Sequence, residues 1–580
     1  MPTNQRSDVS AAGHVIDYLA GQGITAVFGV PGGHLSPFLG ALRRQDRVRF
    51  IIAAHEGGAA FMADGYARAS GKPGVCLVTA GPGVTNALTG LAAAHLDGVP
   101  VLLISGQVPP ERWGLGSIQE STGECGVDVV AALHHAAAYS AGIADIRGFA
   151  RQFGRALAVL RGRPGGAVHL SIPASVARAP LDPASVAGWS AWDRCARPRV
   201  VVDDATREVH RRLVSARRPL VYLGSGAREA LADMGDELRA WVERRGVAVV
   251  TTVRGKGLFP EHSSAALGVH GLAGSPCAAR YLRDGVDALL VVGTRLGEWS
   301  SNNFSRDLRA PFVAQVDRDA AAIGRSISVD LPIVCDAAAF LTNLLGLDAP
   351  DASPDEPGLA RVRALARHRA EVGEADAPTS GDASPLRPQQ LMAELDRHMR
   401  ADLDLYVDMG NCTGWATHCL HISPPARMFV PCGLSTMGWS CGAVLGGKLA
   451  RPERRALALL GDGALLMNGT EINTAARYGI GAVYLVLNDD ALGMVNHGER
   501  HQTGHPIDDG YYGLGGPDLV AFARSLGADA HAVATAGQAA EALRAAFLAA
   551  DEGRPQVIVA RIDPREVPPY GERFRAVSGG

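Results

Sequence analysis

The sequence predicts an α/β protein built from three doubly wound parallel-sheet domains. Its 580 residues are too many for one hydrophobic core, and this length suggests three domains of about 180 residues each. Short apolar runs that end at glycine or a polar residue alternate with alanine-rich helical segments, a pattern typical of parallel sheets. We place the domains at residues 7–185, 200–345 and 386–570, with polar connectors between them.

The first domain is expected to contain strands, helices and one tight turn in close succession. Glu56 follows an apolar run and begins a helix of small residues. A carboxylate in that position can be a simple helix cap, because the helix dipole favours it. The tight turn is Gly81-Pro82-Gly83. The expected strands are residues 75–79, 99–105 and 166–172, and the expected helices are residues 57–69 and 84–96.

The middle domain is expected to alternate strands with alanine-rich helices, and a linker follows it. Two of its predicted strands cover residues 219–224 and 288–293. The segment over residues 348–385 is rich in Asp, Pro, Ala and Glu, and it contains one predicted helix, residues 358–372.

The last domain contains the most informative pattern, a βαβ unit with acidic residues at both strand ends. Strands are predicted at residues 456–460 and 482–487; the first stops at Gly461-Asp462-Gly463 and the second just before Asp489. The crossover places both strand ends on one edge of the sheet, so the two carboxylates should face one crevice. Two oxygen ligands there suit Mg²⁺. The glycines and the helix behind them suit a phosphate group.

Composition and charge exclude several classes of protein. The formal net charge is −3 and the isoelectric point is near 6.7, which gives no electrostatic reason to expect nucleic acid or an anionic membrane as a partner. We see no basic-then-apolar signal pattern at the start and no apolar run that approaches twenty residues. The nine cysteines are scattered, as in a reduced protein, so we expect a cytoplasmic location.

These segments resemble the thiamine diphosphate (thiamine pyrophosphate, TPP) enzymes. Their diphosphate motif is a GDG triplet followed, one βαβ unit later, by two asparagines, and here the second asparagine is Asp489. Their pyrimidine-binding domain carries a glutamate and a GPG-x-TN turn, which match Glu56 and residues 81–86. The resemblance covers the whole chain and implies a pyrimidine-binding, a central and a diphosphate-binding domain.

The resemblance assigns roles to individual residues. Glu56 would be the acid that activates the aminopyrimidine ring, and Asp462, Asp489 and the carbonyl of Ala491 would hold Mg²⁺. Met437 matches the bulky residue that bends the cofactor, while Cys412 stands where relatives often use histidine. The cofactor-binding residues implied in this way are Glu56, Pro82, Asn86, Gly410, Asn411, Met437, Gly461, Asp462, Gly463, Ala464, Asp489 and Met494. Relatives bind the cofactor between two subunits, which implies a homodimer or a homotetramer.

Among these enzymes the chain looks most like the acetolactate synthase large subunit and related carboligases. Gly33 stands where simple 2-oxo acid decarboxylases commonly have Asp or Ser, and Gln119 stands where they often have His. Fewer proton donors would leave the acyl carbanion free to attack a second carbonyl. We therefore expect decarboxylation of a 2-oxo acid, with pyruvate as the first candidate, and transfer of the acyl carbanion to an acceptor carbonyl. The expected catalytic positions are Glu56, Gln119 and Gly33.

Alternative functions remain open at this stage. A decarboxylase that forms no carbon–carbon bond is the nearest one. A nucleotide-binding protein or a noncatalytic cofactor-binding protein would come from another class. Gly224-Ser225-Gly226 and Gly293-Thr294-Arg295 are similar to parts of an FAD site, but such glycines are more typical of ordinary strand-end turns. FAD is therefore not the favoured expectation.

Overall fold

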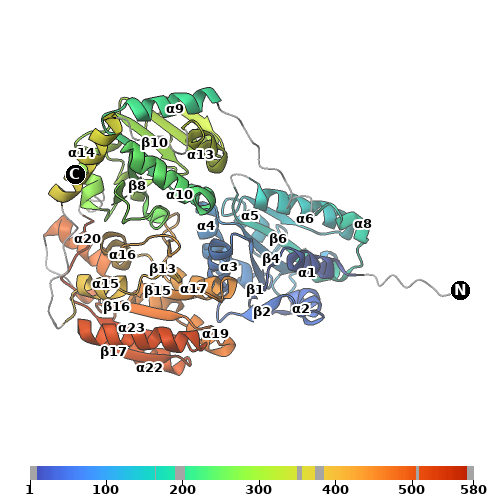
Figure 1. Ribbon diagram of the computed structural model, residues 1–580. Helices are drawn as coiled ribbons and strands as arrows, with labels where there is room; N and C mark the ends of the chain where they lie inside the picture. Colours follow the sequence, from blue (N-terminus) through green and yellow to red (C-terminus); the bar gives the residue numbers. More distant parts are fainter. Residues whose placement is uncertain are drawn as a thin grey trace.

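The computed structural model describes residues 9–162, 165–189, 203–348, 356–372, 385–504 and 509–570. It contains three six-stranded sheets, in which all pairings are parallel, with helices interleaved between the strands (Figure 1). The predicted fold class is confirmed. Parts of both predicted connectors lie outside the described residues, and so do the first two positions of the first predicted domain.

The first sheet has the strand order β2-β1-β3-β4-β6-β5 and is drawn in blue and teal in Figure 1. Its strands are β1 Ala26–Gly29, β2 Arg49–Ile52, β3 Gly74–Val78, β4 Val101–Gln107, β5 Tyr139–Gly142 and β6 Val168–Pro173. Its helices are α1 Ala11–Gly21, α2 Ser36–Arg43, α3 Glu56–Ser70, α4 Pro82–Leu96, α5 Val129–Ala132, α6 Ile146–Arg161, α7 Ala174–Arg178 and α8 Pro183–Val186.

The second sheet has the order β12-β11-β10-β7-β8-β9, so its strand order reverses between β10 and β7. Its strands are β7 Pro219–Leu223, β8 Ala248–Thr251, β9 Ala266–Val269, β10 Ala288–Val292, β11 Val313–Asp317 and β12 Leu331–Val334. Its helices are α9 Asp203–Ser215, α10 Arg228–Arg245, α11 Pro276–Arg283, α12 Glu298–Ser301, α13 Ala337–Leu345 and α14 Glu356–Val372.

The third sheet has the order β14-β13-β15-β16-β18-β17, with its reversal between β13 and β15. Its strands are β13 Leu403–Val407, β14 Arg427–Phe429, β15 Arg455–Gly461, β16 Val483–Asn488, β17 Asp529–Val533 and β18 Gln556–Arg561. Its helices are α15 Pro388–Asp396, α16 Asn411–Cys419, α17 Trp439–Ala450, α18 Asp462–Asn468, α19 Glu471–Tyr478, α20 Gly493–Thr503, α21 Asp509–Tyr512, α22 Leu519–Ser525 and α23 Ala536–Asp551.

The strands and helices predicted from the sequence are confirmed, and their ends move by no more than two residues. The βαβ unit of the last domain is β15, followed by α18 and α19, and then β16. β15 and β16 are parallel neighbours, with Gly461 opposite Leu487. Strands buried on both faces give near-continuous apolar runs, which is why these segments could be located from the sequence.

The first and third domains pack against each other through α3 and α17, and they share one hydrophobic core. Glycines let the two helices approach closely. A Cβ atom on Gly446 would lie 1.8 Å from the carbonyl oxygen of Met62, and one on Gly65 would lie 2.0 Å from the carbonyl oxygen of Ala443. Backbone thus meets backbone across this interface, and any larger residue would force the helices apart.

A buried ion network joins all three domains beside this helix pair. Arg68 of α3 donates to Asp64 at 2.7 Å and to Asp97 at 2.7 Å, and all three side chains are buried. Asp97 also pairs with Arg254 of the middle domain at 3.0 Å. It accepts a hydrogen bond from the backbone of Gly433 in the last domain at 2.9 Å.

Within the described residues, no helix is both long and apolar enough to cross a lipid bilayer.

We expect Gly446→Ala to lower the melting temperature, because the new methyl group would overlap the backbone of α3. Overpacking of this kind costs about 1–3 kcal/mol or more. The control is Gly235→Ala in α10, where an added Cβ meets nothing within 4 Å. Alanine favours helices over glycine, so the control should melt at the same temperature or higher. Thermal unfolding followed by circular dichroism measures both, and equal melting temperatures for the two variants would contradict the close packing.

Candidate active site

Asp462 and Asp489 lie together at the carboxyl edge of the third sheet, as the sequence predicts. Asp462 begins α18 directly after β15, and Asp489 directly follows β16. The side chain of Asp462 is buried, with the residue only 2% exposed, and its Oδ1 accepts the Gly463 amide hydrogen bond at 2.7 Å. The other oxygen, Oδ2, is buried and has no hydrogen-bond partner.

The electrostatics of this pair favour a cation. Burial raises the pKa of Asp462 to about 6. Burial also raises the pKa of Asp489 to about 7, and the negative charge of Asp462 adds to that effect. Nearby backbone N–H groups of the loop, including that of Ala491, act in the opposite direction and lower both pKa values. A divalent cation would offset the like charges and satisfy the unpaired oxygen, so the residues present fit Mg²⁺.

The other positions predicted for the diphosphate side surround the same strand ends. A Cβ atom on Gly463 would lie 3.4 Å from Cε of Met437 and 2.8 Å from Cδ2 of Leu492. Met437 is therefore in contact range of the GDG turn. Ala464 is buried in α18, and Met494 is half-buried in the first turn of α20.

Asn411 is held by a histidine that the sequence did not connect with it. Gly410 ends the turn after β13, and Asn411 begins α16. Nδ2 of Asn411 lies 3.1 Å from Nδ1 of His497, whose Nε2 lies 2.7 Å from the carbonyl oxygen of Pro564. That carbonyl can only accept, so Nε2 carries the hydrogen and Nδ1 accepts from Asn411. Oδ1 of Asn411 is left buried without a partner, whereas Cys412 is turned away and donates to the backbone of Asp408.

Glu56 lies at the carboxyl edge of the first sheet, where α3 begins. The residue is 9% exposed, and its Oε2 accepts a hydrogen bond from Nδ2 of Asn86 at 3.0 Å. Pro82, also predicted for the site, begins α4 four residues before Asn86. Glu471 of the third domain accepts hydrogen bonds from the amides of Ala54 and His55, so it fixes the chain just before Glu56. Sequence patterns gave no signal for that long-range contact.

Gln119 and Gly33 lie near the same edge, together with two residues that the sequence analysis missed. Oε1 of Gln119 accepts a hydrogen bond from Oγ1 of Thr79 at 3.3 Å, and Oγ1 lies 3.4 Å from Nδ1 of His34. Gly33 is exposed, and a Cβ atom there would meet nothing within 4 Å. His34 immediately follows Gly33, so its position beside a predicted catalytic residue was the available signal.

The two clusters are separate within one chain. No hydrogen bond or ion pair among the described residues joins the group around Glu56 to the group around Asp462. Exposed apolar side chains lie next to both groups: Ile118, beside Gln119, is 88% exposed, and Met467, in α18, is 55% exposed.

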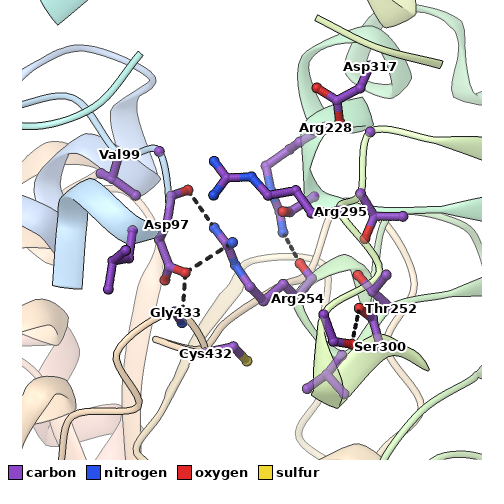
Figure 2. A pocket seen from close by; sticks show the side chains of 18 of the residues that line it. Asp97, Val99, Arg228, Thr252, Arg254, Arg295, Ser300, Asp317, Cys432 and Gly433 are labelled. Carbon is purple, nitrogen blue, oxygen red and sulfur yellow. Dashed lines mark hydrogen bonds and ion pairs between the residues drawn. The ribbon is translucent and has the colours of Figure 1, made fainter. Parts of the chain in front are cut away.

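A third site is a pocket of about 730 Å³ where the three domains meet (Figure 2). It lies at the strand-order reversal of the second sheet, a usual place for ligands in α/β proteins. Figure 2 shows Arg228, Arg254 and Arg295 between Asp97 on one side and Asp317 on the other. Burial, followed by the charges of neighbouring arginines, lowers the pKa of Arg228 to about 10.

Comparison with known proteins agrees with this geometry. Residues 9–132, 206–344 and 408–560 match the models of the N-terminal TPP binding domain, the central domain and the C-terminal TPP binding domain of the thiamine pyrophosphate enzymes.

The curated relatives are similar to almost the whole chain. A putative acetolactate synthase large subunit of Mycobacterium tuberculosis is 34% identical over 89% of this chain and 91% of its own length. A probable acetolactate synthase large subunit of Methanocaldococcus jannaschii is 30% identical over 96% of this chain and 93% of its own length. Three matching domains and relatives of this coverage show that the chain belongs to the family of thiamine pyrophosphate enzymes.

Proposed function

We propose that the chain catalyses the thiamine diphosphate-dependent decarboxylation of a 2-oxo acid and transfers the acyl carbanion to an acceptor carbonyl. Pyruvate is the proposed donor, because the relatives are named acetolactate synthases. The observation that most supports the proposal is the pair of carboxylates formed by buried Asp462 and half-buried Asp489, with one unpaired oxygen. That arrangement favours a cation, and the adjacent GDG turn suits a diphosphate.

Each group of residues has a separate task in this proposal. Asp462, Asp489 and the Ala491 carbonyl would hold Mg²⁺, while Asn411 and the backbone of Gly463 would contact the diphosphate. When bound, thiamine diphosphate supplies a carbon nucleophile and accepts the electrons released with CO₂. Glu56 would hold a proton at the pyrimidine ring, and Asn86 keeps its carboxyl group in place. Gln119 would bind a carboxylate or alkoxide oxygen of the substrate.

The separation of the clusters supports an active site shared between two subunits. The group around Glu56 would come from one chain and the group around Asp462 from another, in at least a homodimer. The exposed apolar side chains beside both groups would then be covered by the partner subunit.

We expect Glu56→Gln to lose about 100-fold or more in turnover while it keeps cofactor binding. General acid–base groups contribute about this much, and the amide oxygen of glutamine can still accept the Asn86 hydrogen bond. The assay is mass spectrometry of products from pyruvate with a panel of carbonyl acceptors; cofactor binding is followed as a rise in melting temperature. Glu237→Gln, at an exposed position of α10, is the control.

Two results of that assay would count against the proposal. Near-normal turnover of Glu56→Gln would end the assignment of Glu56. Free aldehyde as the sole product of the unmodified protein, with every acceptor, would favour the alternative of a decarboxylase that forms no carbon–carbon bond.

A mixture of two inactive variants tests the shared active site. Glu56→Gln and Asp462→Ala each damage a different cluster. If every site combines both chains, a mixed dimer contains one intact site and one doubly damaged site. Random pairing of co-expressed chains should then restore about a quarter of the unmodified activity. A mixture that stays as inactive as its components would place both clusters of each site in one chain.

The pocket of Figure 2 supports a second ligand that carries phosphate groups. Arg228 is half-buried near other arginines and donates to the backbone oxygens of Arg254 and Met428. A bound phosphate would offset this charge.

We expect ADP to raise the melting temperature of the protein and adenosine to raise it much less. An ADP effect no larger than that of adenosine would contradict the proposal, and a flavin spectrum of the purified protein would identify FAD against the expectation from the sequence.

A further inference from the structure

His34 lies in a short turn after β1, where a glycine of β4 leaves room for its side chain. It lies in η1, residues Gly33–Leu35, one turn after the carboxyl end of β1. Gly106 at the end of β4 leaves room for it, because a Cβ atom on Gly106 would lie 2.4 Å from Cβ of His34. The imidazole is therefore set against the carboxyl edge of the first sheet, on the side that holds Glu56.

The hydrogen bonds of His34 define which ring nitrogen is free. Oγ1 of Thr79 donates to Oε1 of Gln119 at 3.3 Å, so it accepts at its contact with Nδ1 of His34. Nδ1 then carries the hydrogen of the neutral ring. Nε2 has no hydrogen-bond partner among the described residues, and the half-buried side chain keeps access to water. Burial lowers the pKa of His34 and outweighs the opposite effect of Gln119, so the protonated ring gives up its proton readily.

Two further observations connect this histidine with the site of Glu56. A Cβ atom on Gly83 would lie 3.2 Å from Cγ2 of Thr79 and 3.5 Å from Oε1 of Glu56, so both side chains border the same space. Gln119 has a backbone φ of +62°, a strained value for a residue with a side chain. Such strain is often found at functional positions, and here it directs Gln119 toward Thr79.

We propose that His34 is a catalytic residue that protonates the acceptor's carbonyl oxygen during carbon–carbon bond formation. This inference rests on the proposed carboligation. The donor carbon supplies the electron pair of the new bond, and the π pair of the acceptor carbonyl moves onto its oxygen. That oxygen takes the proton from Nε2 of His34, while Thr79 and Gln119 hold the ring.

The proposed reaction consumes a proton, and the access of the His34 ring to water provides a source for it. A 2-oxo acid anion that loses CO₂ and adds to a carbonyl consumes one proton for each product formed. Water supplies that proton to Nε2, and His34 passes it to the alkoxide oxygen. No oxidant, reductant or second cofactor is needed.

The test compares His34→Ala with His134→Gln, an exposed histidine of the same domain. With pyruvate as donor, we measure CO₂ release, carbon–carbon product and free acetaldehyde. His34→Ala should form carbon–carbon product about 100-fold more slowly. Its CO₂ release should fall much less, and acetaldehyde should become the main product. His134→Gln should behave like the unmodified protein.

Added imidazole distinguishes proton transfer from a structural role. It should restore part of the carbon–carbon product in His34→Ala, because the truncated side chain leaves space for it. If His34→Ala does not fold, as judged by its melting temperature, His34→Asn replaces it. Asparagine can keep a hydrogen bond to Thr79 but cannot relay a proton, so it should show the same shift toward acetaldehyde.

Three outcomes separate this proposal from the one on which it depends. An unchanged ratio of products in the folded His34 variant would overturn the role of His34. Equal losses of CO₂ and carbon–carbon product, without rescue by imidazole, would also overturn it. Absence of CO₂ release from the unmodified protein with thiamine diphosphate and Mg²⁺ would instead contradict the proposed function.

Discussion

The buried guanidinium of Arg68 is the interaction on which the arrangement of the domains depends. Two carboxylates, Asp64 and Asp97, pair with it, and Nε1 of Trp439 donates to Asp64 at 2.6 Å. A buried charge that loses one partner costs about 3–5 kcal/mol, so every member must stay in place. Because Arg68 lies on α3, the helix that begins with Glu56, the network that orients the domains also fixes the helix that positions Glu56.

The need to balance charges away from water also points to the proposed ligand sites, where buried or half-buried charges lie near charges of the same sign. Arg68 is matched by two acids, whereas Asp462 and Asp489 face each other, and Arg228 faces other arginines. The protein tolerates these unfavourable pairs at strand ends, where a cation or a phosphate can reach them. Poorly matched charges in clefts are a feature of ligand sites, so these two strand ends are where we expect ligands to bind.

Most of the fold could be predicted from the sequence, and so could the positions of the acidic residues at the strand ends, because both follow from local patterns. An apolar strand that stops at Gly461 or at Asn488 is a local pattern, and the handedness of βαβ units then places Asp462 near Asp489. Contacts between distant segments have no such pattern. The sequence analysis therefore did not predict that Glu471 accepts a hydrogen bond from the chain just before α3, or that His497 contacts Asn411. The strained backbone of Gln119 is equally invisible without coordinates.

The position of His34 affects which atom of the reacting substrates receives a proton. From the sequence, Gly33 and Gln119 suggested a site poor in proton donors, which would favour carboligation over release of an aldehyde. The structure adds a histidine beside Gln119, yet the two outcomes differ in the atom that receives the proton. A proton on the donor carbon gives an aldehyde, and a proton on the acceptor oxygen completes the new bond. The open space at Gly33 would leave the carbon unprotonated, while His34 would serve the oxygen, so one site can favour carboligation through both positions.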